Sequence, residues 1–148
     1  MIGFFIAIVS GILMSVQGVF NTGVTKTTSL WLSTGWVQFS ALIVCVVGWM
    51  ITGRTRIDTL WQVQPKYLLL GGVIGAFITL TVIKSMELMG PAKAVLFIVV
   101  AQSAFAYLIE VLGLFGTEKT EFSIQKIIGL LITVAGLVVF QWERSSKV

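Results

Sequence analysis

The side chains best suited to binding a small solute are mostly uncharged polar groups that interrupt long apolar runs. Amides, hydroxyls and a phenol dominate the set, which also holds one indole and one carboxylate. In an apolar medium such groups cost free energy unless they are paired, so they must face another helix or a watered cavity. Interhelical hydrogen bonding explains any single member at least as well as a solute pathway does, but the set as a whole favours the pathway. The candidates are Gln17, Asn21, Trp36, Gln38, Thr79, Gln102, Ser103, Tyr107 and Glu110.

The first apolar run carries its polar residues on one side. Ser10, Met14, Gln17 and Asn21 recur at i, i+4, i+7 and i+11, which is one stripe of an α-helix. A neighbouring face of the same run holds small residues, which allow close contact with another helix. The spacing therefore predicts a helix whose polar stripe faces the protein interior.

Glu110 has two interpretations, because it lies near the end of the fourth apolar run. Its carboxylate could simply reach interfacial water, or it could mark an ion or proton site. The central parts of the apolar runs contain no acidic residue, so coupling through a deeply buried carboxylate is not expected. Lys84 and Glu87, three residues apart at the end of the third run, are expected to form a solvated ion pair.

The sequence offers little for catalysis. It has no histidine and a single cysteine, Cys45, which excludes an intramolecular disulfide and the usual zinc or transition-metal site. The commonest general acid–base residue near neutral pH is also missing. We therefore expect no enzyme activity, no metal and no cofactor; a membrane enzyme would depend on Glu110 alone.

The elements that position these groups follow from the composition. Of 148 residues, 57% are hydrophobic and only 11% are charged, with a mean hydropathy of +1.01. Soluble domains carry about 25% charged residues, so most of this surface must face lipid. The net charge of +4 suits Lys and Arg at lipid headgroups, and no basic patch with interleaved aromatics indicates a nucleic-acid partner.

A helix needs about 20 mostly apolar residues to cross a membrane. Isolated runs in lipid must be helical, because every backbone polar group has to be satisfied within its own segment. The prediction is an all-α integral membrane protein, with residues 1–148 forming a single five-helix transmembrane domain. The predicted spans are 2–20, 30–51, 67–83, 94–112 and 124–140.

The basic residues do not indicate a preferred orientation. Excess Lys and Arg in short loops normally fixes the cytoplasmic side. With five spans, one side carries five basic residues and the other side also carries five. This balance predicts a chain that inserts both ways up and pairs as an antiparallel dimer; a single topology set by weak local effects is the alternative. The two sets are Arg54, Arg56, Lys66, Lys119 and Lys126, and Lys26, Lys84, Lys93, Arg144 and Lys147.

The last predicted span carries small groups on one stripe. Gly129, Thr133 and Gly136 recur at i, i+4 and i+7, while Leu, Ile and Val cover the remaining faces. Small residues let two helices approach closely in lipid. We predict that these three residues form the dimer interface.

Several segments together resemble a known family. The segments are Gln17-Gly18-Val19-Phe20-Asn21 with the later Phe39, the glycine-rich run 71–77, Gln102 with Glu110 ahead of 113–116, and 129–136. Their order and spacing over nearly the whole chain resemble the YdcZ-like, five-helix members of the drug/metabolite transporter superfamily. Where this chain has Glu110-Val111, the family usually has Asp-His.

The resemblance implies a half-sized transporter that pairs head to tail, with itself or with an oppositely oriented paralogue. The prediction is a ten-helix antiparallel dimer that moves a small solute by alternating access around a midplane site. An uncharged polar lining favours neutral, zwitterionic or weakly cationic metabolites, and Trp36 and Tyr107 could contact a cation. A channel, or an accessory membrane subunit that needs a partner chain, is the alternative. The expected location is the plasma membrane of a bacterium.

Overall fold

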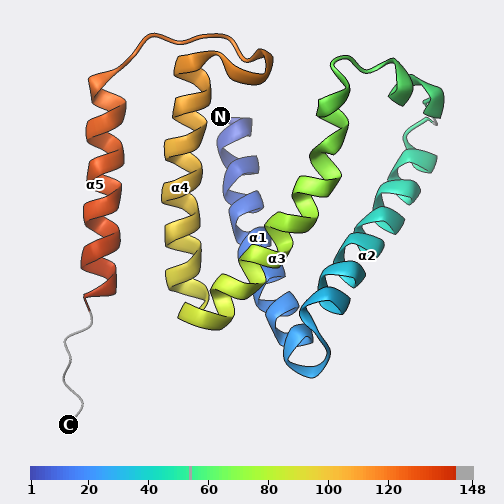
Figure 1. The fold of residues 1–148 in the computed structure, drawn as a ribbon, viewed down its shortest axis with the longest axis horizontal. Helices are drawn as coiled ribbons and strands as arrows, with labels where there is room; N and C mark the ends of the chain where they lie inside the picture. The colour runs from blue at the N-terminus through green and yellow to red at the C-terminus, as the bar shows by residue number, and fades with distance from the viewer. Residues whose placement is uncertain (54, 143–148) are drawn as a thin grey trace. The chain divides into compact units, whose positions relative to one another are not determined.

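The computed structural model describes residues 1–53 and 55–142. Over these residues the chain is helical and contains no strand. The five long helices in Figure 1 are α1 (Ile2–Thr27), α2 (Leu30–Ile51), α3 (Gly71–Met89), α4 (Pro91–Leu112) and α5 (Ile124–Gln141). Three short 3-10 helices lie in the connections: η1 (Ile57–Gln62), η2 (Lys66–Leu70) and η3 (Leu114–Gly116).

All five long helices are long and apolar enough to cross a membrane. Their most apolar 18-residue windows have mean hydropathies between 1.8 and 2.2, and at most 11% of any window is buried within the chain. The apolar side chains therefore lie mostly on outward faces, which lipid must cover. The prediction of an all-α membrane protein with five spanning helices is confirmed.

The first helix extends seven residues beyond its predicted end at Phe20. Its last turns are rich in threonine, and these side chains bond back to the helix instead of breaking it. The Thr22 hydroxyl donates to the carbonyl of Gly18 at 2.8 Å, and that of Thr25 donates to the carbonyl of Asn21 at 2.9 Å. Because the hydroxyls satisfy themselves locally, this polar segment needs no water to remain helical.

The third helix also extends beyond its predicted end, from residue 83 to Met89. Lys84 and Glu87 lie on this extension, with their charged atoms 3.2 Å apart. The helix stops at Gly90, whose φ of 84° lies in a region that favours glycine. Pro91 then begins α4, at a position where its missing N–H costs nothing.

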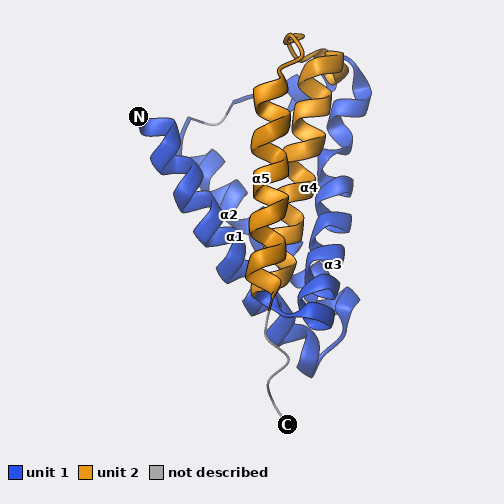
Figure 2. Ribbon diagram, turned by 90° about the vertical axis from the view of Figure 1, so that its left-hand side faces the viewer, with its two compact units in different colours: residues 1–91 blue, residues 92–148 orange. Residues whose placement is uncertain are grey.

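The chain divides into two compact units, coloured separately in Figure 2. The first, residues 1–91, contains α1, α2 and α3, each of which contacts the other two. The second begins at Ala92 and is an antiparallel hairpin of α4 and α5. The single five-helix domain stays a prediction.

The helices α1 and α3 approach each other closely at Gly18. Ile83 and Met86 of α3 are buried, and Met86 packs directly on Gly18 of α1. A Cβ atom built at Gly18 would lie 2.4 Å from the terminal carbon of Met86. Only glycine leaves room for this methionine as it now lies.

Candidate functional site

A small cavity between α1 and α3 gathers three of the predicted binding residues. Its volume is about 50 Å³, enough for a water molecule or two. Gln17 and Asn21 reach it from α1, and Thr79 reaches it from α3. Three apolar residues and one glycine complete the walls; they are Met14, Ile78, Val82 and Gly18. The polar stripe of α1 therefore lies against α3 in this unit.

Gln38 of α2 joins the same cluster through Thr79. The amide nitrogen of Gln38 donates to the Thr79 hydroxyl over a long 3.4 Å, and that hydroxyl donates to the carbonyl of Gly75 at 3.0 Å. Gly75 itself leaves space on this side, since a Cβ there would lie 4.0 Å from the Gln38 nitrogen. The three helices of the unit thus share a neutral hydrogen-bonding cluster.

The start of α2 packs on α1 through a second polar contact. Ser33 is fully buried, and its hydroxyl donates to the backbone carbonyl of Asn21 at 2.9 Å. Thr34 beside it is 4% exposed, and its hydroxyl has no hydrogen-bond partner among the described residues. Ser33 was not among the predicted binding residues. It lies one turn after the Ser29 N-cap and beside other small residues, and this pattern indicates close helix packing.

Trp36 and Gln102 do not join either unit's polar cluster. Trp36 is 60% exposed, with its ring centroid 6.1 Å from that of Phe39 on the same helix. Gln102 is exposed on α4. Their assignment to a binding site stays a prediction, because both lie on surfaces that lipid or another chain would cover.

The second unit holds a larger cavity between α4 and α5, of about 280 Å³. Three predicted residues, Ser103, Tyr107 and Glu110, reach it from α4. From α5 it receives Lys126 and Thr133, and the apolar Ala106 and Leu130 complete its walls. Lys126 had been counted only toward the charge balance, and it is the main functional candidate that the sequence did not single out.

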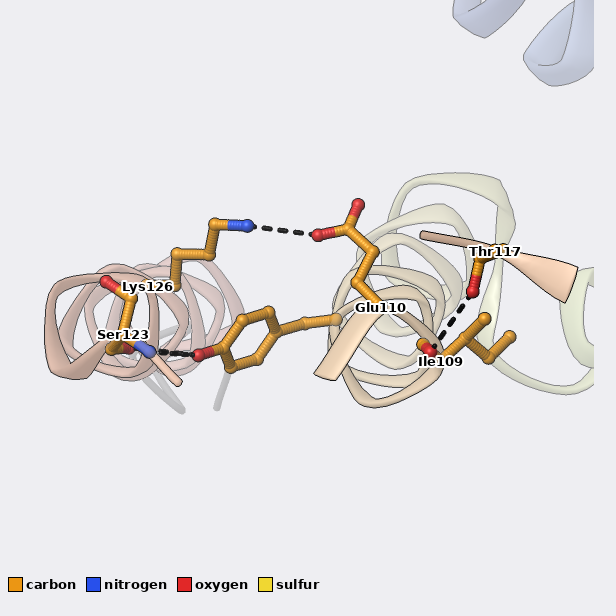
Figure 3. Close-up of polar contacts among 6 residues, drawn as sticks. Ile109, Glu110, Thr117, Ser123 and Lys126 are labelled. Carbon is orange, nitrogen blue, oxygen red and sulfur yellow. Dashed lines mark hydrogen bonds and ion pairs between the residues drawn. The ribbon is translucent and has the colours of Figure 1, made fainter. Parts of the chain in front are cut away.

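Figure 3 shows an ion pair between Glu110 and Lys126, two of the residues that line this cavity. Lys126 Nζ lies 3.0 Å from a carboxylate oxygen of Glu110, and the same ammonium lies 5.1 Å from the centre of the Tyr107 ring. The Glu110 and Lys126 side chains are 47% and 51% exposed. Ion pairs as exposed as this contribute about 0–1 kcal/mol to stability, so the pair can open at small cost.

Tyr107 has a structural task beside this pair. Its hydroxyl accepts a 2.6 Å hydrogen bond from the Ser123 N–H and donates to the Ser123 carbonyl at 3.2 Å (Figure 3). Ser123 is the N-cap residue of α5, and its own side chain makes no capping hydrogen bond. The phenol therefore anchors the start of α5 to α4.

The predicted interface residues of α5 do not all face the same way. Thr133 lines the cavity between α4 and α5, and its hydroxyl donates to the carbonyl of Gly129 at 2.9 Å. Gly129 and Gly136 are exposed, and a Cβ at either would have open space around it. These two positions are available to another helix, and the dimer interface stays a prediction.

These features define a class, a small multi-pass helical membrane protein with polar clusters between apolar helices. The family described as "Putative inner membrane exporter, YdcZ" matches residues 2–139, and the chain belongs to it. The resemblance drawn from the sequence is therefore confirmed. The chain is a multi-pass protein of the bacterial inner membrane and a member of a transport family. Neither the curated proteins nor the solved structures contain a match to it.

Proposed function

We propose that this protein exports a small solute by alternating access, and that it works as an antiparallel dimer of two copies with opposite orientations. The observation that carries the proposal is the pair of cavities, each lined in part by polar side chains, on spanning helices of a chain from an exporter family. Polar groups within spanning helices commonly line the path of a solute or ion.

The number of helices supports the dimer. Five spans offer little room for an enclosed pathway with two gates, whereas two inverted copies give the inverted repeat typical of many transporters. An odd number of spans also places the two ends of the chain on opposite sides of the membrane. Two copies inserted in opposite directions then present the same loops to both sides.

The charges support the two orientations. Five basic residues fall on each side of the predicted topology, so no positive-inside bias holds the chain one way up. Of these ten, Arg54, Arg144 and Lys147 lie outside the described residues. The other seven divide as four, Arg56, Lys66, Lys119 and Lys126, against three, Lys26, Lys84 and Lys93.

Two-sided cysteine labelling tests the orientation. In a Cys45→Ser background, Lys26→Cys places a thiol at the α1–α2 turn, and a matched variant, Glu118→Cys, places one in the α4–α5 loop. A membrane-impermeant thiol reagent is applied to cells before and after permeabilisation. We expect about half of each variant to react from outside. Reaction of Lys26→Cys and Glu118→Cys from opposite single sides would contradict dual topology.

A further inference from the structure

We propose that the cavity between α4 and α5 is a binding site for a zwitterion that carries a primary ammonium and a nearby anionic oxygen. This inference rests on the proposed function, because it names the class of solute that the exporter carries. The ligand ammonium pairs with the Glu110 carboxylate, and the ligand anion accepts from the Lys126 ammonium. The ligand thus replaces the internal 3.0 Å pair with two pairs of its own.

The signs of the Glu110 and Lys126 charges are opposite to those that their helix ends favour. Glu110 lies in the last turn of α4, and Lys126 lies in the first turn of α5. A helix dipole disfavours an anion at the C-terminus and a cation at the N-terminus. Both charges therefore lie at the unfavourable ends of their helices, which helix stability does not explain.

A bound zwitterion in the proposed orientation reverses this mismatch. Its anion lies by Lys126 at the start of α5, where helix N–H groups favour negative charge. Its ammonium lies by Glu110 at the end of α4, where the helix dipole favours positive charge. The two helix ends and the two side chains then select the same ligand polarity.

Only a zwitterion leaves both Glu110 and Lys126 with a charged partner when it binds. A ligand with only a positive charge could take Glu110 but would leave Lys126 without its carboxylate. A ligand with only a negative charge would leave Glu110 without its ammonium. A zwitterion satisfies both, and the half-exposed pair that it opens is of the weak, solvated kind.

The shape of the cavity limits the size of the ligand. Ser103 lies seven residues before Glu110 on α4, and Thr133 lies seven residues after Lys126 on α5, so both hydroxyls lie about 10 Å deeper. Ala106 and Leu130 give apolar walls between the two levels. A charged end beside the ion pair and a short, mostly apolar body along the walls fit a free amino-acid-like solute, and the charged end alone fits the headgroup of an ethanolamine phospholipid.

The test is ligand binding to the purified full-length protein in phosphatidylcholine nanodiscs, whose lipid lacks a primary ammonium. The probes are L-leucine, its methyl ester, which keeps only the cation, and N-acetyl-leucine, which keeps only the anion. Binding is measured by calorimetry and by the shift in thermal unfolding. We expect saturable binding of leucine, with both derivatives at least tenfold weaker.

Variants assign the binding to the pair. Glu110→Gln and Lys126→Gln should each weaken leucine binding about tenfold or more. The matched control is Glu87→Gln, which removes the exposed Lys84–Glu87 pair of the other unit and should leave binding unchanged. Circular dichroism and gel filtration establish that each variant is folded; if one of the two charge-removing variants is not, the other carries the test, with Glu110→Asp, which keeps the charge, expected to retain binding.

A second set of nanodiscs separates the two sources of the ligand. If leucine is bound only in phosphatidylcholine discs and is displaced when phosphatidylethanolamine is added, the site accepts the headgroup as well. If phosphatidylethanolamine alone raises the unfolding temperature, and Glu110→Gln removes that shift, the headgroup is the ligand; both results support the zwitterion site. Equal binding of leucine and its two derivatives, an unaltered response in Glu110→Gln, or no response to either zwitterion overturns it. Cysteine labelling decides the orientation separately, so a failure of either proposal is recognised without the other.

Discussion

The two units of the chain handle polar groups in opposite ways. In α1–α3 the polar contacts between helices join neutral, partly buried groups, as Ser33 does with Asn21 and Gln38 does with Thr79. The Lys84–Glu87 ion pair of this unit lies within α3 alone. In the α4–α5 hairpin the principal polar contact is a half-exposed ion pair at one end. The first arrangement holds helices together within lipid, whereas the second leaves charges that can exchange partners.

This difference indicates a division of roles between packing and binding. Substitutions in the first unit should act mainly on the stability of the helix bundle. Substitutions at the ion pair should barely change stability but should change ligand binding. Variants of both units test this contrast.

Filling the closest helix contact should have the largest effect on stability. Gly18→Leu forces a side chain into the space of Met86, and overpacking of this kind costs about 1–3 kcal/mol. Gly11→Leu on the same helix is the control, since a Cβ at Gly11 meets nothing within 4 Å. Thermal unfolding in detergent measures both. If Gly18→Leu unfolds at the same temperature as Gly11→Leu, the α1–α3 approach is not as close as described.

Removing the phenol hydroxyl that anchors α5 should have the second-largest effect on stability. Tyr107→Phe loses two hydrogen bonds to Ser123, which together contribute about 1–2 kcal/mol. Backbone hydrogen exchange at the start of α5 should accelerate, while exchange in α1–α3 stays unchanged. Equal hydrogen exchange in Tyr107→Phe and in the unmodified protein would show that the Tyr107 hydroxyl does not anchor the start of α5.

The buried hydroxyl between α1 and α2 should have a smaller effect. Ser33→Ala removes one interhelical hydrogen bond, worth about 0.6 kcal/mol on average in membrane proteins. Ser10→Ala is the matched control, because the Ser10 hydroxyl bonds only to the Ile6 carbonyl of its own helix and is exposed. A loss of stability no larger in Ser33→Ala than in Ser10→Ala would argue against the contact.

The ion pair should have the smallest effect on stability. Glu110→Gln is expected to change the free energy of unfolding by no more than about 1 kcal/mol, because both charged groups are half-exposed. Efflux should nevertheless fall in this variant and in Gln102→Ala. Unchanged efflux in both would show that these α4 residues are not part of the solute pathway.

The helices could be predicted from the sequence because run length and hydropathy alone decide which segments cross lipid. The grouping of Gln17 with Asn21 followed from helical spacing. The partner helix did not: the approach of Thr79 to this stripe and the packing of Met86 on Gly18 depend on how each helix is rotated and tilted. Periodicity within one helix carries no information on that rotation.

Two features of the candidate site were missed for similar reasons. Lys126 lies sixteen residues from Glu110, and only the antiparallel hairpin brings them together. The predicted end of α1 was too early because a threonine-rich segment is typical of a loop in water. Here the threonine hydroxyls donate to carbonyls of the same helix. The first contact forms only when the α4–α5 hairpin closes, whereas the second forms within α1 itself.

The most direct test of the central proposal is whether oppositely oriented copies pair. Thr27→Arg with Thr28→Arg adds positive charge at the α1–α2 turn, and Glu118→Arg with Glu121→Arg adds it in the α4–α5 loop, which fixes the two variants in opposite orientations. Each variant is made with two different affinity tags, and co-purification from one membrane is measured. We expect opposite variants to co-purify strongly and like variants not to co-purify. Pairing of like variants as strong as pairing of opposite variants would contradict the antiparallel dimer.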